Sequence, residues 1–372
     1  MKAEQIVFKN GKWCGEFLLK DADIVFVFAE GDAIAGELWQ KDLRDMFVSA
    51  IIIGCSSSGS IYDDSILDNC VVATAIKLER SYAMLAFEQN ICPNSSFAVG
   101  QKIATKLSKE GLKHIIVFSD GLSVNGSKLT DGFNSVHFNA NVHVSGGLVG
   151  DGARFLKTFV TANSAPLQGA VAAIGLYGDV FAKTGCFAGW DEFGADRVIT
   201  KSIGNVVYEI DGEKALELYK KYLGEEAQDL PSSGLKFPLS IKKNQNDPYI
   251  IRTLLAIDKE AQSVTFAGEA PEGYICKLMK SNLDKLIENA GFAAKEANYE
   301  GEQKGVCLTV SCIGRRMALG GLAEEELETL KEVLGEKVLL FGFYSYGEIA
   351  PIESLANCFL HNQTMAVTTI YE

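Results

Sequence analysis

Apolar runs of strand length alternate with longer amphipathic stretches, and this alternation occurs three times along the chain. The first unit has a β-rich run at 23–28, an amphipathic stretch at about 33–48 and a second apolar run at 50–53. Apolar side chains recur in roughly helical register through the middle stretch, which predicts a helix between two strands. The second run leads into the glycine- and serine-rich residues 54–59. The pattern therefore predicts a strand, a helix and a second strand that ends in a glycine turn.

The same frame returns in two further units. In the second unit the predicted strand, helix, second strand and glycine turn lie at 114–118, about 127–136, 142–144 and 146–152. In the third unit they lie at 306–310, about 323–334, 337–341 and 342–348. Such units need crossover connections, so we expect each pair of strands to be parallel. Four other apolar runs have no helix between them and predict antiparallel strands, at 71–77, 170–176, 200–210 and 250–257.

The first and third glycine turns share a residue pattern. The motif G-x-x-S-x-G-x-I begins at Gly54 and again at Gly342, each time at the end of the same strand–helix–strand frame. This match indicates an internal duplication, and the two parts are expected to join within 200–235. We therefore predict an α/β fold of two related halves, each a mixed β-sheet with helices packed outside.

Composition limits the classes of protein to which the chain can belong. Hydrophobic residues make up 47% of the 372 residues and charged residues 22%, which is typical of a globular protein. The formal net charge is −13 without any lysine- and arginine-rich block, which argues against binding to nucleic acid or to an anionic membrane. Nine cysteines, with no C-x-x-C pair, indicate free thiols in a reducing compartment. Because no signal core or long apolar run occurs, we expect a cytoplasmic protein.

The glycine turns are candidate binding elements. Their backbone N–H groups can form anion-binding nests, and ligands of such sheets collect beyond the carboxyl ends of parallel strands. Charged residues accompany the turns: Asp120, Asp151, Arg315, Arg316 and Glu348. The alternative is that the glycines only form tight turns and the charges face water. The sequence contains no phosphate loop, nucleophile elbow or dinucleotide fingerprint, so we expect no enzyme of those kinds.

One thiol stands out. Cys312 follows a predicted strand and precedes Arg315 and Arg316, which would lower the pKa of a nearby thiol. A nucleophilic Cys312 also needs a base close to it in the fold, such as His361. The favoured alternative is a small buried residue beside a turn.

Ten short stretches, in their order along the chain, together resemble one protein family. They are Gly54 to Gly59, Ser119 to Gly121, Gly146 to Asp151, Gly189 with Trp190, Phe237 to Leu239, Arg252, Pro271 to Gly273, Ser311 to Arg315, Gly342 to Ile349, and His361 to Thr364. The chain resembles the FIST family, the F-box and intracellular signal transduction domains. The resemblance implies an N-terminal FIST domain at 1–213 and a C-terminal FIST domain at 214–372.

The resemblance also implies a sensory, ligand-binding protein. Bacterial relatives are proposed to bind small molecules such as amino acids, and some relatives bind haem and respond to nitric oxide. Many relatives are fused to a kinase, chemoreceptor or cyclase domain. Because the FIST pair fills this chain, we expect a signal to pass through a separate partner, such as a kinase or chemoreceptor.

The first functional hypothesis is a cytoplasmic sensor of an amino acid or a similar small metabolite, without a required cofactor. Arg315 and a nest at Gly146, Gly147 and Gly150 would bind the ligand carboxylate. Glu348, Asp120 or Asp151 would bind the ligand ammonium, and Trp190, Tyr344 and Tyr346 would form walls. Three alternatives remain open: a haem-based nitric oxide sensor with His361 or His143 as axial ligand, a thiol enzyme that uses Cys312, and a scaffold that binds only protein.

The glycine turns of the second and third units are expected to meet in one cleft. Both turns leave the carboxyl ends of strands in related units. Any charges buried there must either pair with each other or bind a charged ligand, because an isolated buried charge is costly.

Overall fold

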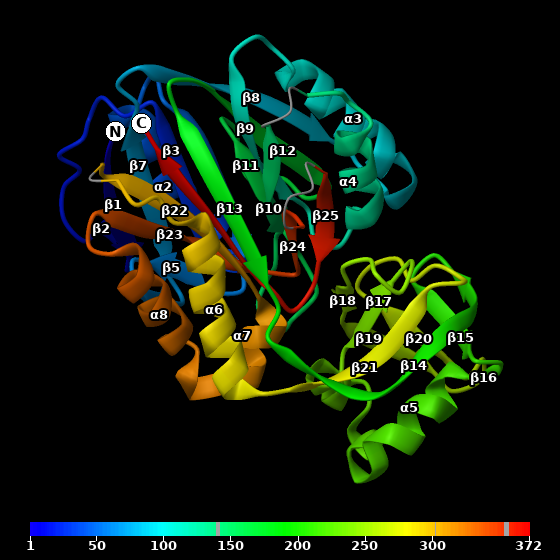
Figure 1. The fold of residues 1–372 in the computed structure, drawn as a ribbon. Helices are drawn as coiled ribbons and strands as arrows, with labels where there is room; N and C mark the ends of the chain where they lie inside the picture. Colours follow the sequence, from blue (N-terminus) through cyan, green and yellow to red (C-terminus); the bar gives the residue numbers. More distant parts are fainter. Residues whose placement is uncertain (139–141, 302, 353–356) are drawn as a thin grey trace.

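Three six-stranded mixed sheets form a large body, and a smaller domain is inserted near the middle of the chain (Figure 1). The computed structural model describes residues 1–138, 142–301, 303–352 and 357–372. The two ends of the chain lie side by side in the body (Figure 1), where the Met1 ammonium is 3.4 Å from the Glu372 carboxylate. Among the helices described, none is both long and apolar enough to cross a membrane.

Each sheet of the body has its strands in the following spatial order. Sheet I is β11 (Val160–Ala162), β4 (Ile51–Ser57), β3 (Ile24–Glu30), β7 (Val71–Lys77), β1 (Lys2–Lys9) and β2 (Lys12–Trp13). Sheet II is β25 (Cys358–His361), β24 (Gly347–Pro351), β10 (His143–Leu148), β9 (Leu112–Ser119), β12 (Ala170–Gly178) and β8 (Ser81–Gln89). Sheet III is β13 (Phe181–Phe187), β26 (Met365–Tyr371), β22 (Gly305–Cys312), β23 (Val338–Ser345), β5 (Ser60–Tyr62) and β6 (Ser65–Leu67).

Each sheet is built around one predicted strand–helix–strand unit. The pairs β3 and β4, β9 and β10, and β22 and β23 are parallel, as predicted. On the side of the first strand of each pair, two antiparallel strands follow in the same order in all three sheets. The predicted mixed sheets with helices outside are confirmed, and the repetition extends to three units that share one strand order.

The three units exchange edge strands in a cycle. After its parallel pair, unit one sends β5 to sheet III, unit three sends β24 to sheet II, and unit two sends β11 to sheet I. Each of these strands pairs antiparallel with the second strand of the receiving unit. The predicted division at residues 213 and 214 stays a prediction; strands from both sides of it share sheets II and III.

In each unit, one glycine of the second strand permits that strand to lie close to the first strand of the parallel pair. Gly54, Gly146 and Gly342 lie opposite Val27, Val117 and Thr309 of the adjacent parallel strand. A Cβ at these glycines would lie 1.9, 1.9 and 1.8 Å from the facing carbonyl oxygens. No side chain fits in that space, so the repeated glycine is a requirement of the sheets rather than of a turn.

Helices cover the outer face of each sheet. The helices α1 (Gly31–Ile34) and α2 (Glu37–Met46) pack on sheet I, and α3 (Ser96–Leu107) and α4 (Gly126–Asn134) pack on sheet II. On sheet III lie α6 (Leu283–Ala297) and α8 (Glu325–Leu334), with the short α7 (Ile313–Leu319) beside them (Figure 1). The inner faces meet in one apolar core, in which Phe118 of sheet II lies 5.6 Å from both Phe28 of sheet I and Phe343 of sheet III, ring centre to ring centre.

The small domain is an insertion between β13 and α6 of the third unit. Its strands, in sheet order, are β18 (Ile250–Arg252), β17 (Leu239–Lys242), β21 (Ile275–Ser281), β14 (Trp190–Ile203), β15 (Val206–Ile210), β20 (Ser263–Phe266) and β19 (Leu254–Asp258), and β16 (Glu213–Lys214) pairs with β15. One helix, α5 (Ala215–Leu223), packs on them around a separate apolar core. Figure 1 shows β14 and β21 connecting this domain to the body.

Three sequence expectations change in detail. The helix expected at 33–48 is two helices, α1 and α2. The single strand expected at 200–210 is the end of β14, a turn at Gly204 and the strand β15, because Gly204 adopts a φ of 61° that reverses the chain. The run at 250–257 is likewise two strands, β18 and β19, that pair with different neighbours.

Candidate functional site

The segments that follow the second strand of each unit contact one another. Tyr346 donates its backbone N–H to the Leu148 carbonyl at 2.8 Å, and Ser58 donates its own to the Tyr344 carbonyl at 2.9 Å. Gly150 lies between them, since a Cβ there would be 2.3 Å from the Ser58 hydroxyl and 3.0 Å from the Tyr346 ring. The predicted meeting of the second and third units therefore occurs at Tyr346.

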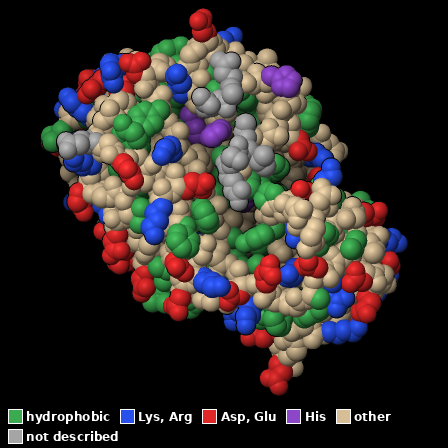
Figure 2. Space-filling model, in the orientation of Figure 1, with side chains coloured by type: hydrophobic (Ala, Val, Ile, Leu, Met, Phe, Trp, Pro, Cys, Tyr) green, Lys and Arg blue, Asp and Glu red, His purple; other side chains and the backbone are tan. Residues whose placement is uncertain are grey.

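A hollow opens beside this meeting point, between the body and the small domain. Its volume is about 310 Å³, and we call it the Tyr346 hollow. The body contributes Gly121, Leu148, Phe155 and Tyr346, and the small domain contributes Asn205, Leu255, Gly268 and Glu269. Figure 2 shows hydrophobic side chains gathered where the two parts meet. Ligand sites form preferentially at such junctions of domains.

Two stacked aromatic rings form one wall of the Tyr346 hollow. The Phe155 and Tyr346 rings lie 4.4 Å apart, centre to centre, at an angle of 14°. The Tyr346 hydroxyl donates to the Asp151 carboxylate, and the Phe155 N–H donates to the Tyr346 hydroxyl at 3.2 Å. Phe155 keeps 43% of its surface exposed, so its ring is accessible to a ligand in the hollow.

The N-terminus of a helix and a carboxylate both line the Tyr346 hollow. Helix α4 begins at Gly126, which lines the hollow together with its N-cap residue Asn125. The first N–H groups of a helix have no partner within it, so this end carries a partial positive charge. The Glu269 carboxylate also lines the hollow and pairs with the Lys128 ammonium of α4 at 3.2 Å. The Asn125 side chain already accepts the Lys128 N–H at 3.0 Å, so the N–H groups before it in α4 are the ones left for a ligand. The hollow therefore offers N–H donors and a carboxylate, the two groups that a zwitterion needs.

Two predicted carboxylates, Asp120 and Asp151, lie near the hollow but already have partners. Asp120 accepts backbone N–H groups from Leu122 at 2.9 Å, Ser123 at 2.6 Å and Gly169 at 2.8 Å. Asp151 accepts the N–H groups of residues 155, 156 and 157 at 2.8 to 2.9 Å. Burial opposes the ionisation of Asp151, but hydrogen bonds from the Lys157 N–H and the Tyr346 hydroxyl outweigh it and lower its pKa. Both carboxylates fix the loops that shape the hollow.

Arg315 and Tyr344 lie elsewhere, in the interior next to sheet III. The Arg315 guanidinium pairs with the Glu326 carboxylate at 2.9 Å, and neither side chain is exposed. The Tyr344 hydroxyl donates to the same carboxylate at 2.8 Å. Of the two cases expected for buried charges, Arg315 is therefore in the ion-paired one. Arg316, in contrast, pairs with Asp68 at 2.6 Å on the side of sheet III that carries β5 and β6.

Glu348 is buried and forms no ion pair with any residue that the structure describes. Its carboxylate accepts hydrogen bonds from the Ser345 hydroxyl at 2.6 Å and from the Thr364 hydroxyl and N–H at 2.8 and 3.1 Å. Burial raises the pKa of Glu348 to about 7, and these hydrogen bonds offset only part of the effect. Glu348 lies in β24, which pairs with β10, and does not line the Tyr346 hollow.

Gly146, Gly147 and Trp190, which were also predicted for the site, have their polar groups engaged within the fold. Gly146 and Gly147 lie inside β10 and pair with β9 and β24, so they form no free nest. Strand β10 continues to Leu148, beyond the apolar run at 142–144 from which it was predicted. The N–H groups of Gly146 and Gly147 therefore belong to a sheet rather than to a turn. Trp190 is buried at the junction of the small domain, where its indole N–H donates to the Gln363 carbonyl at 3.0 Å.

The candidate thiol and histidines are also buried. Burial raises the pKa of the Cys312 thiol, and the nine cysteines are all free thiols. The His361 imidazole donates to the Ala350 carbonyl at 3.1 Å, and burial lowers its pKa to about 4. His143 is partly buried, in register with His114 of β9. Because neither His361 nor His143 lines the Tyr346 hollow, the residues described there do not fit a haem with an axial histidine.

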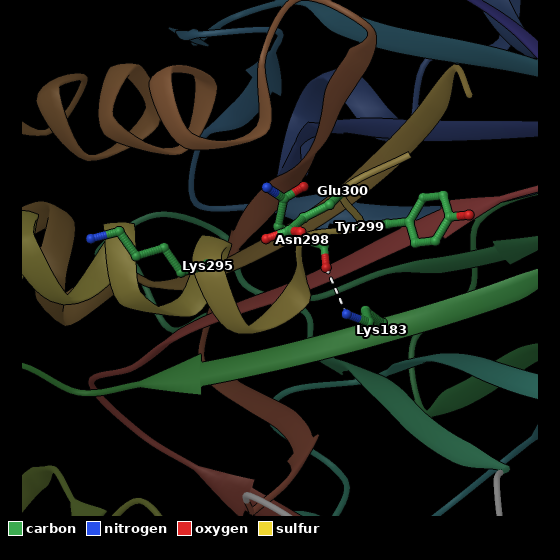
Figure 3. Close-up of a pocket in the computed structure, with 5 residues that line it drawn as sticks. All are labelled: Lys183, Lys295, Asn298, Tyr299 and Glu300. Atoms are coloured by element: carbon green, nitrogen blue, oxygen red, sulfur yellow. Dashed lines mark hydrogen bonds between the residues drawn. The ribbon is translucent and has the colours of Figure 1, made fainter. Parts of the chain in front are cut away.

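Another hollow lies at the carboxyl end of α6 (Figure 3). It has a volume of about 490 Å³ and is lined by Lys183, Lys295 and residues 298–300. Lys183 spans it by donating to the Asn298 carbonyl at 2.8 Å. It contains none of the residues that the sequence predicted for a site.

Sequence reasoning missed Phe155, Asn205 and Glu269. Phe155 follows the glycine-rich segment 146–152, and Glu269 follows Gly268. Their places after glycines near strand ends were a sequence signal that could have identified them. Asn205 and Glu269 reach the hollow only because the small domain folds back onto the body, which no local pattern indicates.

Comparisons with known proteins identify the family of the chain. The FIST N domain family model matches residues 23–213, and the FIST C domain family model matches residues 215–351. The uncharacterized protein Mb0898c of Mycobacterium bovis and the uncharacterized protein MT0897 of Mycobacterium tuberculosis are each 25% identical over 226 residues. These alignments cover 56% of this chain and 56% of each relative, so the chain spans about half the length of the curated relatives it matches. The chain belongs to the FIST family, with a FIST N domain and a FIST C domain in tandem, and such domains are linked to signal transduction and small-ligand sensing.

Proposed function

We propose that this protein senses an amino acid or a similar small zwitterion in the Tyr346 hollow. The observation that carries the proposal is that the N-terminus of α4 and the Glu269 carboxylate line the same hollow. Glu269 pairs there with Lys128 of α4, and a ligand ammonium would share this carboxylate with Lys128. The stacked rings of Phe155 and Tyr346 form a wall for a ligand side chain. A ligand carboxylate would accept N–H groups of α4, and its ammonium would donate to Glu269.

The same ligand would act on two parts of the molecule at once. Asn205, Leu255 and Glu269 come from the small domain, whereas Phe155 and Tyr346 come from the body. A ligand that contacts both parts stabilises the arrangement in which both sets of contacts exist, and this differential affinity is the physical basis of a signal. We propose that a separate protein, such as a kinase or chemoreceptor, reads the arrangement in the cytoplasm. The free thiols support a reducing compartment.

The test is a thermal-unfolding screen of the whole chain against the twenty amino acids, followed by calorimetric titration of any that respond. A ligand at 100 times its dissociation constant should stabilise the protein by about 2.7 kcal/mol. Glu269→Gln and Phe155→Ala should each weaken binding by about tenfold or more, because they remove the ammonium partner and the aromatic wall. Glu260→Gln, an exposed change in the same small domain, is the matched control. If no amino acid shifts the unfolding temperature, or if binding ignores both site variants, the proposal is wrong.

A further inference from the structure

A separate hollow lies next to Arg252 and shares Glu269 with the Tyr346 hollow. It has a volume of about 450 Å³, and we call it the Arg252 hollow. Glu269 lines both hollows, while Gly268 and Tyr346 line only the first. A Cβ on Gly268 would lie 3.0 Å from the Arg252 guanidinium carbon, so this glycine lets the arginine occupy its place. The two hollows are therefore neighbours with separate chemistry.

The Arg252 guanidinium is buried without a carboxylate partner among the residues that the structure describes. Only 5% of the surface of Arg252 is exposed. Its Nε donates to the Glu269 carbonyl at 2.8 Å, and its Nη1 donates to the carbonyls of Ile251 at 3.1 Å and Leu360 at 3.0 Å. These acceptors are neutral, and Nη2 makes no hydrogen bond within the described parts of the chain. Burial lowers the pKa of Arg252 to about 10, which leaves it charged at neutral pH.

Three carboxylates, those of Asp131, Asp247 and Glu269, also line the Arg252 hollow, and each of them is engaged with another group. The Glu269 carboxylate pairs with Lys128 at 3.2 Å, and Asp131 lies 3.5 Å from the same ammonium. Asp247 accepts the backbone N–H and the side-chain amide of Asn244 at 3.0 and 2.8 Å. The Glu269 charge offsets the burial of Arg252 only in part, and an anionic ligand in the hollow would offset more of that cost.

The walls of the Arg252 hollow define the rest of such a ligand. Apolar side chains line it from both parts of the molecule, including Ile241 and Ile250 of the small domain and Phe359 and Leu360 of the body. Lys242 and the exposed Lys243 add two further cations. An inorganic anion would match the cations but leave the apolar walls without contact, whereas an organic anion would match both.

We propose that the Arg252 hollow binds a small organic carboxylate with an apolar body. Nη2 of Arg252 donates to the carboxylate, Lys243 attracts it at the entrance, and the hydrocarbon packs on Phe359 and Leu360. This site goes beyond the amino-acid site, because it uses a different cation and has a ligand that needs no ammonium group.

Calorimetric titration of the whole chain with phenylacetate tests the proposal, with neutral phenylacetamide as the matched probe. Phenylacetate should bind at least about tenfold more tightly than the amide, because a ligand charge then meets the guanidinium. Arg252→Gln should weaken phenylacetate binding about tenfold or more, and Lys243→Ala a few-fold. Lys259→Ala, which removes an exposed lysine of the same domain, is the control and should leave binding unchanged.

Lys243 keeps the test decisive if Arg252→Gln does not fold, because Lys243 is exposed and removing its side chain disturbs no core. Equal affinities for phenylacetate and the amide, or phenylacetate binding that neither site variant weakens, would overturn the proposal. So would the absence of any phenylacetate binding at millimolar concentration. A response to phenylacetate without any response to amino acids would support this site and contradict the proposed function alone.

Discussion

Arg315 and Glu326 form an ion pair with a separation of 2.9 Å in which neither side chain has any exposed surface. The Glu326 carboxylate also accepts hydrogen bonds from Ser311 and Tyr344, at 2.9 and 2.8 Å. The guanidinium nitrogen Nη2 of Arg315, which pairs with Glu326, also donates to the Leu286 carbonyl of α6 at 2.8 Å. The pair thus joins α7 and α8 to the helix that follows the small domain, which makes it a structural element rather than a ligand site.

Arg315→Ala should destabilise the protein without a direct effect on ligand binding. The change leaves the Glu326 carboxylate buried without its counter-charge, a loss of about 3–5 kcal/mol in the free energy of unfolding. The double variant Arg315→Met with Glu326→Leu should be much less destabilised, because it removes both charges and fills the space with apolar atoms. Urea-induced unfolding of the two variants measures this difference. Equal losses in the single and double variants would contradict it.

Glu348 should make stability depend on pH. The folded-state pKa of about 7 lies above the usual glutamate value of about 4.3, so the folded protein holds a proton that the unfolded chain releases. The stability due to this proton is fully present below about pH 4, and it is lost as the pH rises through about 7. Glu348→Gln, which keeps the shape but cannot ionise, should remove this part of the dependence. Urea unfolding at pH 5, 6, 7 and 8 measures the free energy of unfolding of the two proteins. The difference between these free energies should change by at most about 1.4 kcal/mol per pH unit. Parallel curves for the two proteins would rule out this role.

The three repeated glycines should tolerate no side chain. Gly342→Ala and Gly54→Ala place a Cβ within 1.8 and 1.9 Å of a backbone carbonyl oxygen, so two parallel strands must move apart. We expect either protein to be destabilised by more than about 4 kcal/mol or not to fold. Gly321→Ala is the matched control, since nothing lies within 4 Å of a Cβ at that glycine. Yield of folded protein and unfolding temperature provide the measurement, and a stable Gly342→Ala protein would refute the argument.

Cys312 should react slowly with alkylating reagents in the folded protein. Burial raises the pKa of its thiol, whereas Cys92 is exposed and hydrogen bonding with Ser95 lowers the pKa of its thiol. Mass spectrometry after a short treatment with iodoacetamide should find Cys92 modified and Cys312 unmodified. Early labelling of Cys312 would restore the hypothesis of a thiol enzyme.

The sequence predicted the local frame of the fold because that frame depends on short-range patterns. The parallel pairs, such as β22 and β23, follow from apolar runs that flank an amphipathic helix. The G-x-x-S motif also placed Gly54 and Gly342 at equivalent positions, although their purpose is close strand pairing rather than a turn. The exchange of β5, β11 and β24 between sheets was not predictable, because no local property of a three- to five-residue strand selects a partner far along the chain.

The site was harder to predict than the fold. Tyr346 was identified from its place after a strand end, and it does line the hollow. Arg315 has the same kind of position in the sequence, yet its partner Glu326 lies on the inner face of α8, which turns an apparent ligand cation into an internal pair. Glu269 and Arg252 come from an inserted domain whose contact with the body depends on tertiary packing alone.

The cyclic exchange of edge strands has a consequence for how the chain is assembled on the ribosome. Sheet I has all of its strands once β11 has been made, at Ala162. Sheets II and III must wait for β25 and β26, which end at His361 and Tyr371, so two sheets stay open long after sheet I has all of its strands. Until their partners β24 and β26 emerge, β10 and β22 expose unpaired backbone edges, which are templates for pairing with other chains. A stop before Cys358 would therefore remove strands from two of the three sheets at once, and a nascent chain would depend on rapid synthesis of these strands or on a chaperone to remain free of aggregation.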